Sequence, residues 1–235
     1  MRLAIHQPEF MPWGGFFYKM TLSDLYVIFD HVQFKKRYFE NRNQVVSPKG
    51  EISYIRVPVL TKGKEAQALH EVKIDNTQKW NDKMLKKIRH FYSKAPYFRK
   101  YFDELAELIA YRKYVYLIDL NIKLIDFFRK HLGISVPMVS SSQMNVKNYT
   151  GSDLIMRICL LNKADIYLCG ASGIDYIRAD DFCRNGIQIK WLNYSTPAYS
   201  QLCDKFVPNM STLDLLFNRG NESLNVLMNS VKRKD

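Results

Sequence analysis

The chain has 235 residues, of which 47% are hydrophobic, and its formal net charge is +12. This length suits one sizeable hydrophobic core, and two small domains are also compatible with it. No apolar run is long enough for a spanning helix, and the first residues do not resemble a signal peptide, so we expect a cytoplasmic protein. The basic balance favours polyanionic partners such as nucleotides, nucleic acid or an anionic membrane surface.

Cysteine and lysine usage add little to this picture. The four cysteines, at positions 159, 169, 183 and 203, form no CxxC pair and have no histidine at zinc-ligand spacing. We therefore expect reduced structural thiols and no metal site. For the basic tail at Lys232 to Lys234 we expect a solvated terminus.

The first third of the chain shows strand patterns. Residues 2–6 predict a short buried strand, and residues 25–34 a longer one. Residues 43–60 predict a hairpin whose turn, Ser47 to Gly50, contains a proline that presets φ and a glycine that can take positive φ. Residues 69–74 are one more candidate strand.

Helical periodicity then runs from about Trp80 to His131, with a break at Ala95 and Pro96 and a glycine stop at Gly133. The last third alternates: a helix from about residue 150 to 162, a strand at 163–170, a helix at 173–186 and a strand at 187–192. This order predicts an α/β fold with a mainly parallel, Rossmann-like sheet, a β-hairpin and a helical insertion. We expect one domain, residues 1–235, with residues 77–133 as the helical subdomain or insertion.

The opening loop is the first candidate for chemistry. Open α/β sheets bind ligands where a loop leaves the carboxyl end of a strand and feeds a helix, which is where His6 and Gln7 would lie. Prolines and glycines shape this loop, Trp13 lies within it, and Lys19 is placed to reach back to a phosphate or carboxylate. The alternative is a satisfied core histidine with Trp13 as a packing anchor.

Residues 30–44 are the second candidate. They combine carboxylate, amide and basic side chains: Asp30, Gln33, Lys35, Asn41, Arg42 and Asn43. Guanidinium binds phosphate bidentately and amides bind sugar hydroxyls or base edges, so the mixture suits a sugar nucleotide or an RNA end. An exposed basic turn is the alternative.

Two later stretches are weaker candidates. Residues 169–177 place small residues between a strand and a helix, where backbone N–H groups can face an anion, although a simple tight turn explains them equally well. Residues 191–201 carry aromatic and amide side chains that could stack on a base or sugar ring, although core packing is the alternative for Trp191. The residues concerned are Ser172, Gly173, Asp175, Tyr176, Tyr194, Tyr199 and Gln201.

Several enzyme classes lack their motifs here. The sequence contains no nucleophile elbow with a Ser, His and acid arrangement, no complete GxGxxG and no paired histidines on a helix. These absences argue against α/β-hydrolases, classical dehydrogenases and zinc hydrolases.

The chain resembles the WbqC-like protein family from residue 3 to about residue 205. The segments that carry the resemblance are IHQPEFMPWGGFFYK, DHVQFKKRYFENRN, Ala95-Pro96-Tyr97, ADIYLCGASGIDYI and IQIKWLNYSTPAYSQ. Members of that family are associated with bacterial surface polysaccharide gene clusters, including O-antigens with an aminoacylated 4-amino-4,6-dideoxy sugar. The resemblance implies a cytoplasmic enzyme that decorates a nucleotide-activated amino sugar, and it supplies no catalytic assignment.

We therefore expect an N-acyltransferase that acts on the amine of a dTDP-linked amino sugar. The donor could be aminoacyl-tRNA, an amino acid plus ATP, or acyl-CoA. Residue chemistry suggests His6 as the base and Asp30 as its orienting or substitute partner. Gln7 and Asn43 are candidates for oxyanion or sugar contacts, and Lys19, Lys35 and Arg42 for phosphates.

Two other functions stay open. One is a non-catalytic protein that binds nucleic acid or a polysaccharide-synthesis complex, with binding that weakens steeply as salt rises. The other is a nucleotidylyl or glycosyl transferase, which would need a metal and hence a carboxylate cluster. Asp175, Asp180 and Asp181 are near one another in sequence, but no DxD element is present.

Overall fold

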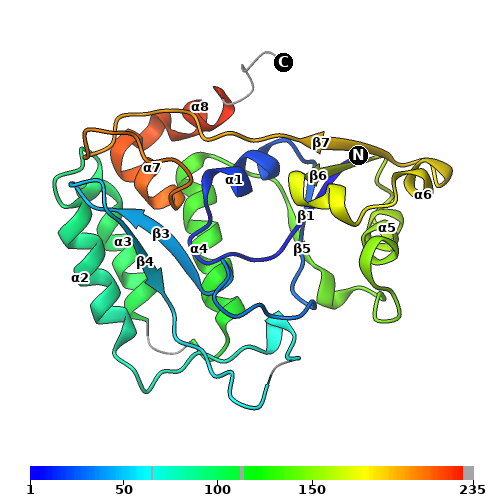
Figure 1. Cartoon of the computed structure of the whole chain (residues 1–235), viewed down its shortest axis with the longest axis horizontal. Helices are drawn as coiled ribbons and strands as arrows, with labels where there is room; N and C mark the ends of the chain where they lie inside the picture. Colours follow the sequence, from blue (N-terminus) through cyan, green and yellow to red (C-terminus); the bar gives the residue numbers. More distant parts are fainter. Residues whose placement is uncertain (65, 112–113, 230–235) are drawn as a thin grey trace.

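A computed structural model describes residues 1–64, 66–111 and 114–229 of the chain. The basic tail at residues 232–234 lies outside the described residues. Figure 1 shows the sheet on one side of the molecule and a hairpin packed beside helices on the other. Within the described ranges, no helix is both long and apolar enough to span a membrane.

The main sheet is parallel throughout. Its five strands are β1 (Arg2–His6), β2 (Leu25–Ile28), β5 (Met138–Ser140), β6 (Ile166–Gly170) and β7 (Gln188–Leu192), and they lie in the order β5-β2-β1-β6-β7. The first strand is therefore central, and the chain adds strands first on one side of it and then on the other. This confirms the predicted α/β class with a parallel sheet.

Side-chain alternation in the strands gives the sheet two buried faces. In β1, Ala4 belongs to one core cluster, and Leu3 and Ile5 belong to the other. Helix α1 (Gly14–Thr21) packs on the first face, and helices α5 (Gly151–Leu161) and α6 (Ala179–Arg184) supply the second. Both faces are covered, as parallel sheets require.

The predicted hairpin forms a separate two-stranded antiparallel sheet. Strands β3 (Arg42–Val46) and β4 (Ile52–Arg56) pair on either side of the predicted turn, where Gly50 has φ +82°. The helical middle comprises α2 (Trp80–Tyr92), α3 (Phe98–Ala110) and α4 (Leu117–Leu132), and Gly133 ends it in the left-handed region. These helices share one core cluster with the hairpin and one face of the parallel sheet. The single-domain organisation stays a prediction.

Two predicted strands need correction. The strand expected at residues 25–34 ends at Ile28, because the Asp30 backbone N–H donates to the Ile28 carbonyl and the chain turns away. Residues 69–74 are not a regular strand. Leu69–Glu71 form a 3-10 turn, η1, whose first and second N–H groups pair with the carbonyls of Val32 and Asp30.

The expected helix at residues 173–186 is divided. A 3-10 segment, η3 (Ala171–Asp175), follows β6 directly, and α6 begins at Ala179. Short strand β5, the 3-10 turns η2 (Ser141–Gln143) and η4 (Gly220–Glu222), and helices α7 (Thr212–Arg219) and α8 (Ser223–Met228) were not predicted. These elements form through contacts with segments that are distant in sequence, and their local residue patterns are weak.

The Ala95-Pro96-Tyr97 segment connects the helical middle to the C-terminal helices. The Tyr97 backbone N–H donates to the Phe217 carbonyl over 3.0 Å. A side chain at Gly220, which has φ +53°, would overlap the Tyr97 ring. The close approach of these two residues gives this segment a structural role away from the sheet's carboxyl edge.

Candidate functional site

The strand order places a topological switch point between β1 and β6, since the chain leaves these neighbouring strands in opposite directions. Ligands of open α/β sheets bind in the crevice at the carboxyl ends of such strands. A cavity of about 950 Å³ lies there. Its walls come from the opening loop, from residues 35–44, from the loop after β6 and from the segment after β7.

His6 ends β1 and lines this cavity, as predicted. Its Nδ1 donates to the Gln7 carbonyl over 3.0 Å, which leaves Nε2 as the unprotonated nitrogen. Burial, reinforced by the positive charge of Lys19, lowers the pKa of His6 to about 3. The ring is therefore neutral at pH 7.

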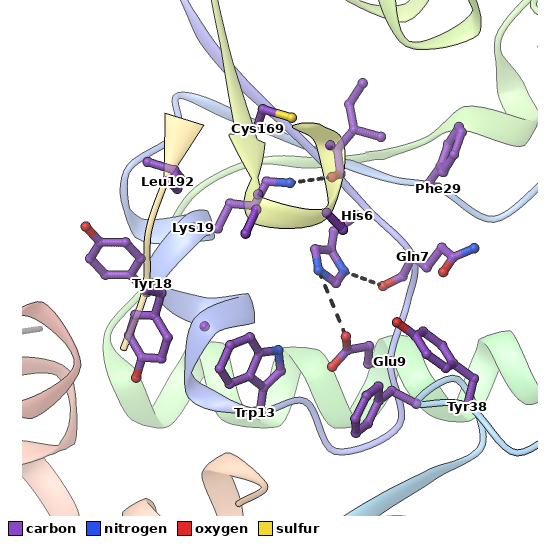
Figure 2. A pocket seen from close by; sticks show the side chains of 18 of the residues that line it. His6, Gln7, Glu9, Trp13, Tyr18, Lys19, Phe29, Tyr38, Cys169 and Leu192 are labelled. Atoms are coloured by element: carbon purple, nitrogen blue, oxygen red, sulfur yellow. Dashed lines mark hydrogen bonds and ion pairs between the residues drawn. The ribbon is translucent and has the colours of Figure 1, made fainter. Parts of the chain in front are cut away.

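The carboxylate beside His6 is Glu9, not the Asp30 that the sequence suggested. Figure 2 shows the His6 ring directed toward Glu9, and His6 Nε2 lies 3.9 Å from Glu9 Oε1. Asp30 is held elsewhere: its carboxylate accepts hydrogen bonds from the Ser141 hydroxyl and from the backbone N–H and hydroxyl of Ser142. Asp30 is absent from the cavity lining, and its contacts tie the end of β2 to the end of β5.

Glu9 and Glu40 are buried carboxylates on the same cavity wall. Burial and the nearby charge of Glu40 raise the pKa of Glu9 to about 8, against the opposing effects of a Trp13 backbone hydrogen bond and the Lys19 charge. Burial raises the pKa of Glu40 to about 7, and the backbone N–H of Glu40 and the charge of Lys35 oppose this. Both groups therefore titrate near neutral pH, the range in which general acids and bases work best.

Buried asparagines hold the loops that carry these carboxylates. From α4, the Asn121 amide donates to the carbonyls of Pro8 and Glu40 over 2.9 and 2.8 Å. The Asn43 amide donates to the Phe10 and Met11 carbonyls. Asn43 thus shapes the opening loop from behind, and the structure gives it no place in the cavity wall as a sugar or oxyanion contact.

The two lysines near the cavity differ in their surroundings. Lys19 lines the cavity as predicted, but it is buried and its Nζ donates a hydrogen bond to the Ile5 carbonyl over 2.7 Å. The predicted phosphate contact of Lys19 stays a prediction. Burial lowers the pKa of Lys19 to about 8. Lys35 lines the cavity with its Nζ 5.5 Å from the centre of the Tyr38 ring. Lys35 is therefore the better candidate for an anionic ligand.

The opposite wall comes from the loops after β6 and β7. Ser172, Gly173, Asp175 and Tyr176 all line the cavity, so the predicted small-residue loop and His6 share one site. Trp13 and Tyr194 also line it and pack edge to face at 5.3 Å. A side chain at Gly14 would come within 2.5 Å of the Tyr194 hydroxyl, which explains a glycine there. Gln7 lines the cavity as well.

The other predicted site residues lie outside the cavity lining. Arg42 stacks on Tyr54 of the hairpin at 4.5 Å, and the Asn41 amide donates to the Val57 carbonyl. The side chains of Tyr199 and Gln201 both donate to the Asp214 carboxylate, which fastens the segment after β7 to α7. Gln33 bridges to Ala68 in the η1 region. Trp191 is not in the core, since its side chain is exposed.

Sequence reasoning missed several cavity residues: Glu9, Tyr18, Tyr38, Glu40, Gln44, Cys169, Asn193 and Asn209. Glu9 had a visible signal, because it is a lone charge between prolines and large apolar residues in QPEFMPW. Glu40 had none, since a charge in an already charged segment is unremarkable. The four cysteines are free; three are buried as expected, and Cys183 is exposed.

Comparison with known proteins agrees with the resemblance drawn from the sequence. The model of the WbqC-like protein family matches residues 7–226. This chain belongs to that family. The family is associated with O-antigen biosynthesis. An uncharacterized protein of Mycobacterium tuberculosis is 31% identical over 223 residues, which cover 94% of this chain and 95% of that protein. No solved structure matches the chain.

The family match includes both cavity walls. Residues 7–226 contain the opening loop after His6, the Glu40 segment and the loops after β6 and β7. The match thus extends over the described cavity almost completely, with Ile5 and His6 immediately before its first residue.

Proposed function

We propose that this protein is an N-acyltransferase that joins an acyl group, such as glycyl, to the amine of a dTDP-linked 4-amino-4,6-dideoxy sugar. The single observation that carries the proposal is the neutral His6 beside the buried Glu9 in a cavity at the switch point of the sheet. Ionisable groups with strongly perturbed pKa values in a cleft are candidates for proton transfer. The family's association with O-antigen biosynthesis supports an amino sugar as the acceptor.

The reaction requires three things of the site. The attacking ammonium must lose a proton, the oxyanion that forms on the acyl carbonyl needs hydrogen-bond donors, and the sugar nucleotide needs a cation and an aromatic surface. His6 Nε2 or Glu9 would accept the proton. Lys35 would contact the pyrophosphate, and Trp13 and Tyr194 would pack against the base or sugar.

The cavity also has suitable dimensions and polarity. A volume of about 950 Å³ is at the upper end of the usual range for ligand pockets, roughly 300–1,000 Å³. Its wall mixes aromatic side chains with carboxylates, amides and two lysines. Such a lining suits a sugar nucleotide better than a purely apolar ligand.

Mass spectrometry of reaction products tests the proposal. The dTDP-amino sugar is incubated separately with glycyl-tRNA, with glycine plus ATP, and with acyl-CoA. We expect an acylated sugar with one of these donors, and a His6→Ala variant that folds normally should lose at least a hundredfold in turnover, the usual contribution of a positioned acid or base. No product with any donor would refute the transferase, and full activity of His6→Ala would remove His6 from proton transfer.

The same assays separate the rival functions. A non-catalytic nucleic-acid-binding protein would show no turnover and an RNA affinity that falls steeply with salt. A nucleotidylyl or glycosyl transferase would need a carboxylate cluster, yet Asp181 is paired with Arg178 and Arg184. Among the described residues, no three His, Cys, Asp or Glu side chains are arranged to hold a metal ion.

A further inference from the structure

The cavity wall contains three acceptor oxygens that are buried without a partner. Glu9 is 6% exposed and Glu40 is fully buried, and both line the cavity. Within the described residues, Glu9 Oε2 and both carboxylate oxygens of Glu40 have no hydrogen-bond partner. Buried polar atoms are nearly always hydrogen-bonded, so three unpaired oxygens on one wall require an explanation.

Neighbouring charges do not supply that explanation. Lys19 and Lys35 act on the pair through their charge, but the Lys19 Nζ hydrogen bond goes to the Ile5 carbonyl and Lys35 lies over Tyr38. His6 is neutral, and its Nε2 is 3.9 Å from Glu9, beyond hydrogen-bond length. The backbone N–H groups of Trp13 and Glu40 favour the charged forms of Glu9 and Glu40. Among the described residues, however, no donor lies within hydrogen-bond distance of Glu9 Oε2 or of either Glu40 oxygen.

We propose that Glu9 and Glu40 form a binding site for a primary ammonium group, and that the Glu9 carboxylate accepts the proton this group must lose. The inference rests on the proposed acyl transfer, in which the sugar amine is the nucleophile. An ammonium group carries three N–H donors, which equals the number of unpaired oxygens. A hydroxyl group has one donor and leaves two oxygens unpaired.

The proton transfer is balanced within the site. One N–H bond of the ammonium breaks, an O–H bond forms on Glu9, and the electron pair stays on nitrogen, which then attacks the acyl carbonyl. Glu40 keeps the second negative charge near the ammonium until the proton has moved. The charges of the two carboxyl groups interact. The positive charge of the bound ammonium lowers the pKa of Glu9, so Glu9 releases its own proton to solvent on binding and becomes the free carboxylate that the transfer requires.

Titration calorimetry with two sugar nucleotides tests the site directly. The ligands are a dTDP-4-amino-4,6-dideoxyhexose and its counterpart with a hydroxyl at C4. We expect wild-type protein to bind the amine at least tenfold more tightly, the typical worth of one charge-assisted hydrogen bond. Glu9→Gln and Glu40→Gln should each lose this preference, while their affinity for the hydroxyl ligand stays within about twofold of wild type.

A control variant and a proton count exclude a structural explanation. Glu107→Gln makes the same chemical change on an exposed position of α3 and should keep the preference. At pH 7.5, titrations in buffers of different ionisation enthalpy should show that wild type releases protons when the amine binds, because the ammonium lowers the pKa values of the pair. Glu9→Gln should release fewer.

Each result of the calorimetry either supports the ammonium site or overturns it. Equal affinity of wild type for both ligands, or a preference that survives in both variants, would overturn the ammonium site even where acyl transfer is observed. If neither sugar nucleotide binds, the proposed function fails, and the methyl glycosides of the same two sugars serve as probes. A preference for the amino glycoside that is lost in Glu9→Gln and Glu40→Gln supports the site, and no preference overturns it.

Discussion

Replacing Glu9 with glutamine should change how the stability of this protein depends on pH. The pKa of Glu9 is about 8 in the folded protein, against 4.5 for an unperturbed glutamate. The folded state therefore holds a proton that the unfolded state has released, and stability falls as pH rises from about 4.5 toward 8. One pKa unit is worth about 1.4 kcal/mol, so the loss between about pH 5 and about pH 8 is on the order of 3 kcal/mol.

Glutamine resembles the protonated carboxyl in shape and does not titrate. The free energy of unfolding of Glu9→Gln should therefore not fall in this way as pH rises. Urea unfolding, followed by tryptophan fluorescence at several pH values, gives the free energy of unfolding of each variant. We expect the difference between Glu9→Gln and wild type to grow by about 3 kcal/mol over this range. For the control Glu107→Gln, the free energy of unfolding should depend on pH as it does for wild type. If the free energy of unfolding of Glu9→Gln shows the same pH dependence as wild type, the Glu9 carboxyl is not held protonated in the folded protein. The raised pKa of Glu9 is then refuted.

Three further predictions concern the surroundings of the cavity. Asn121→Ala removes two hydrogen bonds to buried carbonyls and should destabilise the protein by about 1–3 kcal/mol in urea; an unchanged midpoint would contradict the bridging role. Gly220→Ala should lower the free energy of unfolding by about 1–3 kcal/mol. The decrease should exceed that of Gly133→Ala, because both glycines have positive φ but only Gly220 lies against a ring, that of Tyr97. In the acylation assay, Lys35→Ala should raise KM for the sugar nucleotide at least tenfold while Arg42→Ala, outside the cavity, leaves it unchanged; the reverse order would show that the anion binds along the hairpin.

Much of the fold could be predicted because its signals are local. The short opening strand, the turn at Ser47 to Gly50 and the glycine stop at Gly133 each depend on a few adjacent residues, and all three are present. The alternation in the last third predicted a parallel sheet for the same reason. Strand β5 is three residues long and has no such pattern, since it exists through its pairing with β2.

The candidate site was predicted in part. A histidine directly after a buried first strand must lie at the carboxyl edge of the sheet, and the loop after β6 ends at the same edge, so their meeting follows from topology. The amide and basic residues at 41–43 were assigned by chemical type. Their side chains instead hold the backbone together or stack on the hairpin, because direction depends on which distant carbonyls and rings are close by.

The sequence by itself determined the α/β class, the opening strand with His6 at its end, the alternation of helix and strand between residues 150 and 192, and the excess of positive charge. Tertiary structure alone decided which carboxylate stands beside His6, since Asp30 is engaged by serines more than a hundred residues away and Glu9 is brought to Glu40 by an asparagine from α4. The same contacts set the pKa values, because desolvation and charge proximity depend on segments that are remote in sequence and adjacent in space.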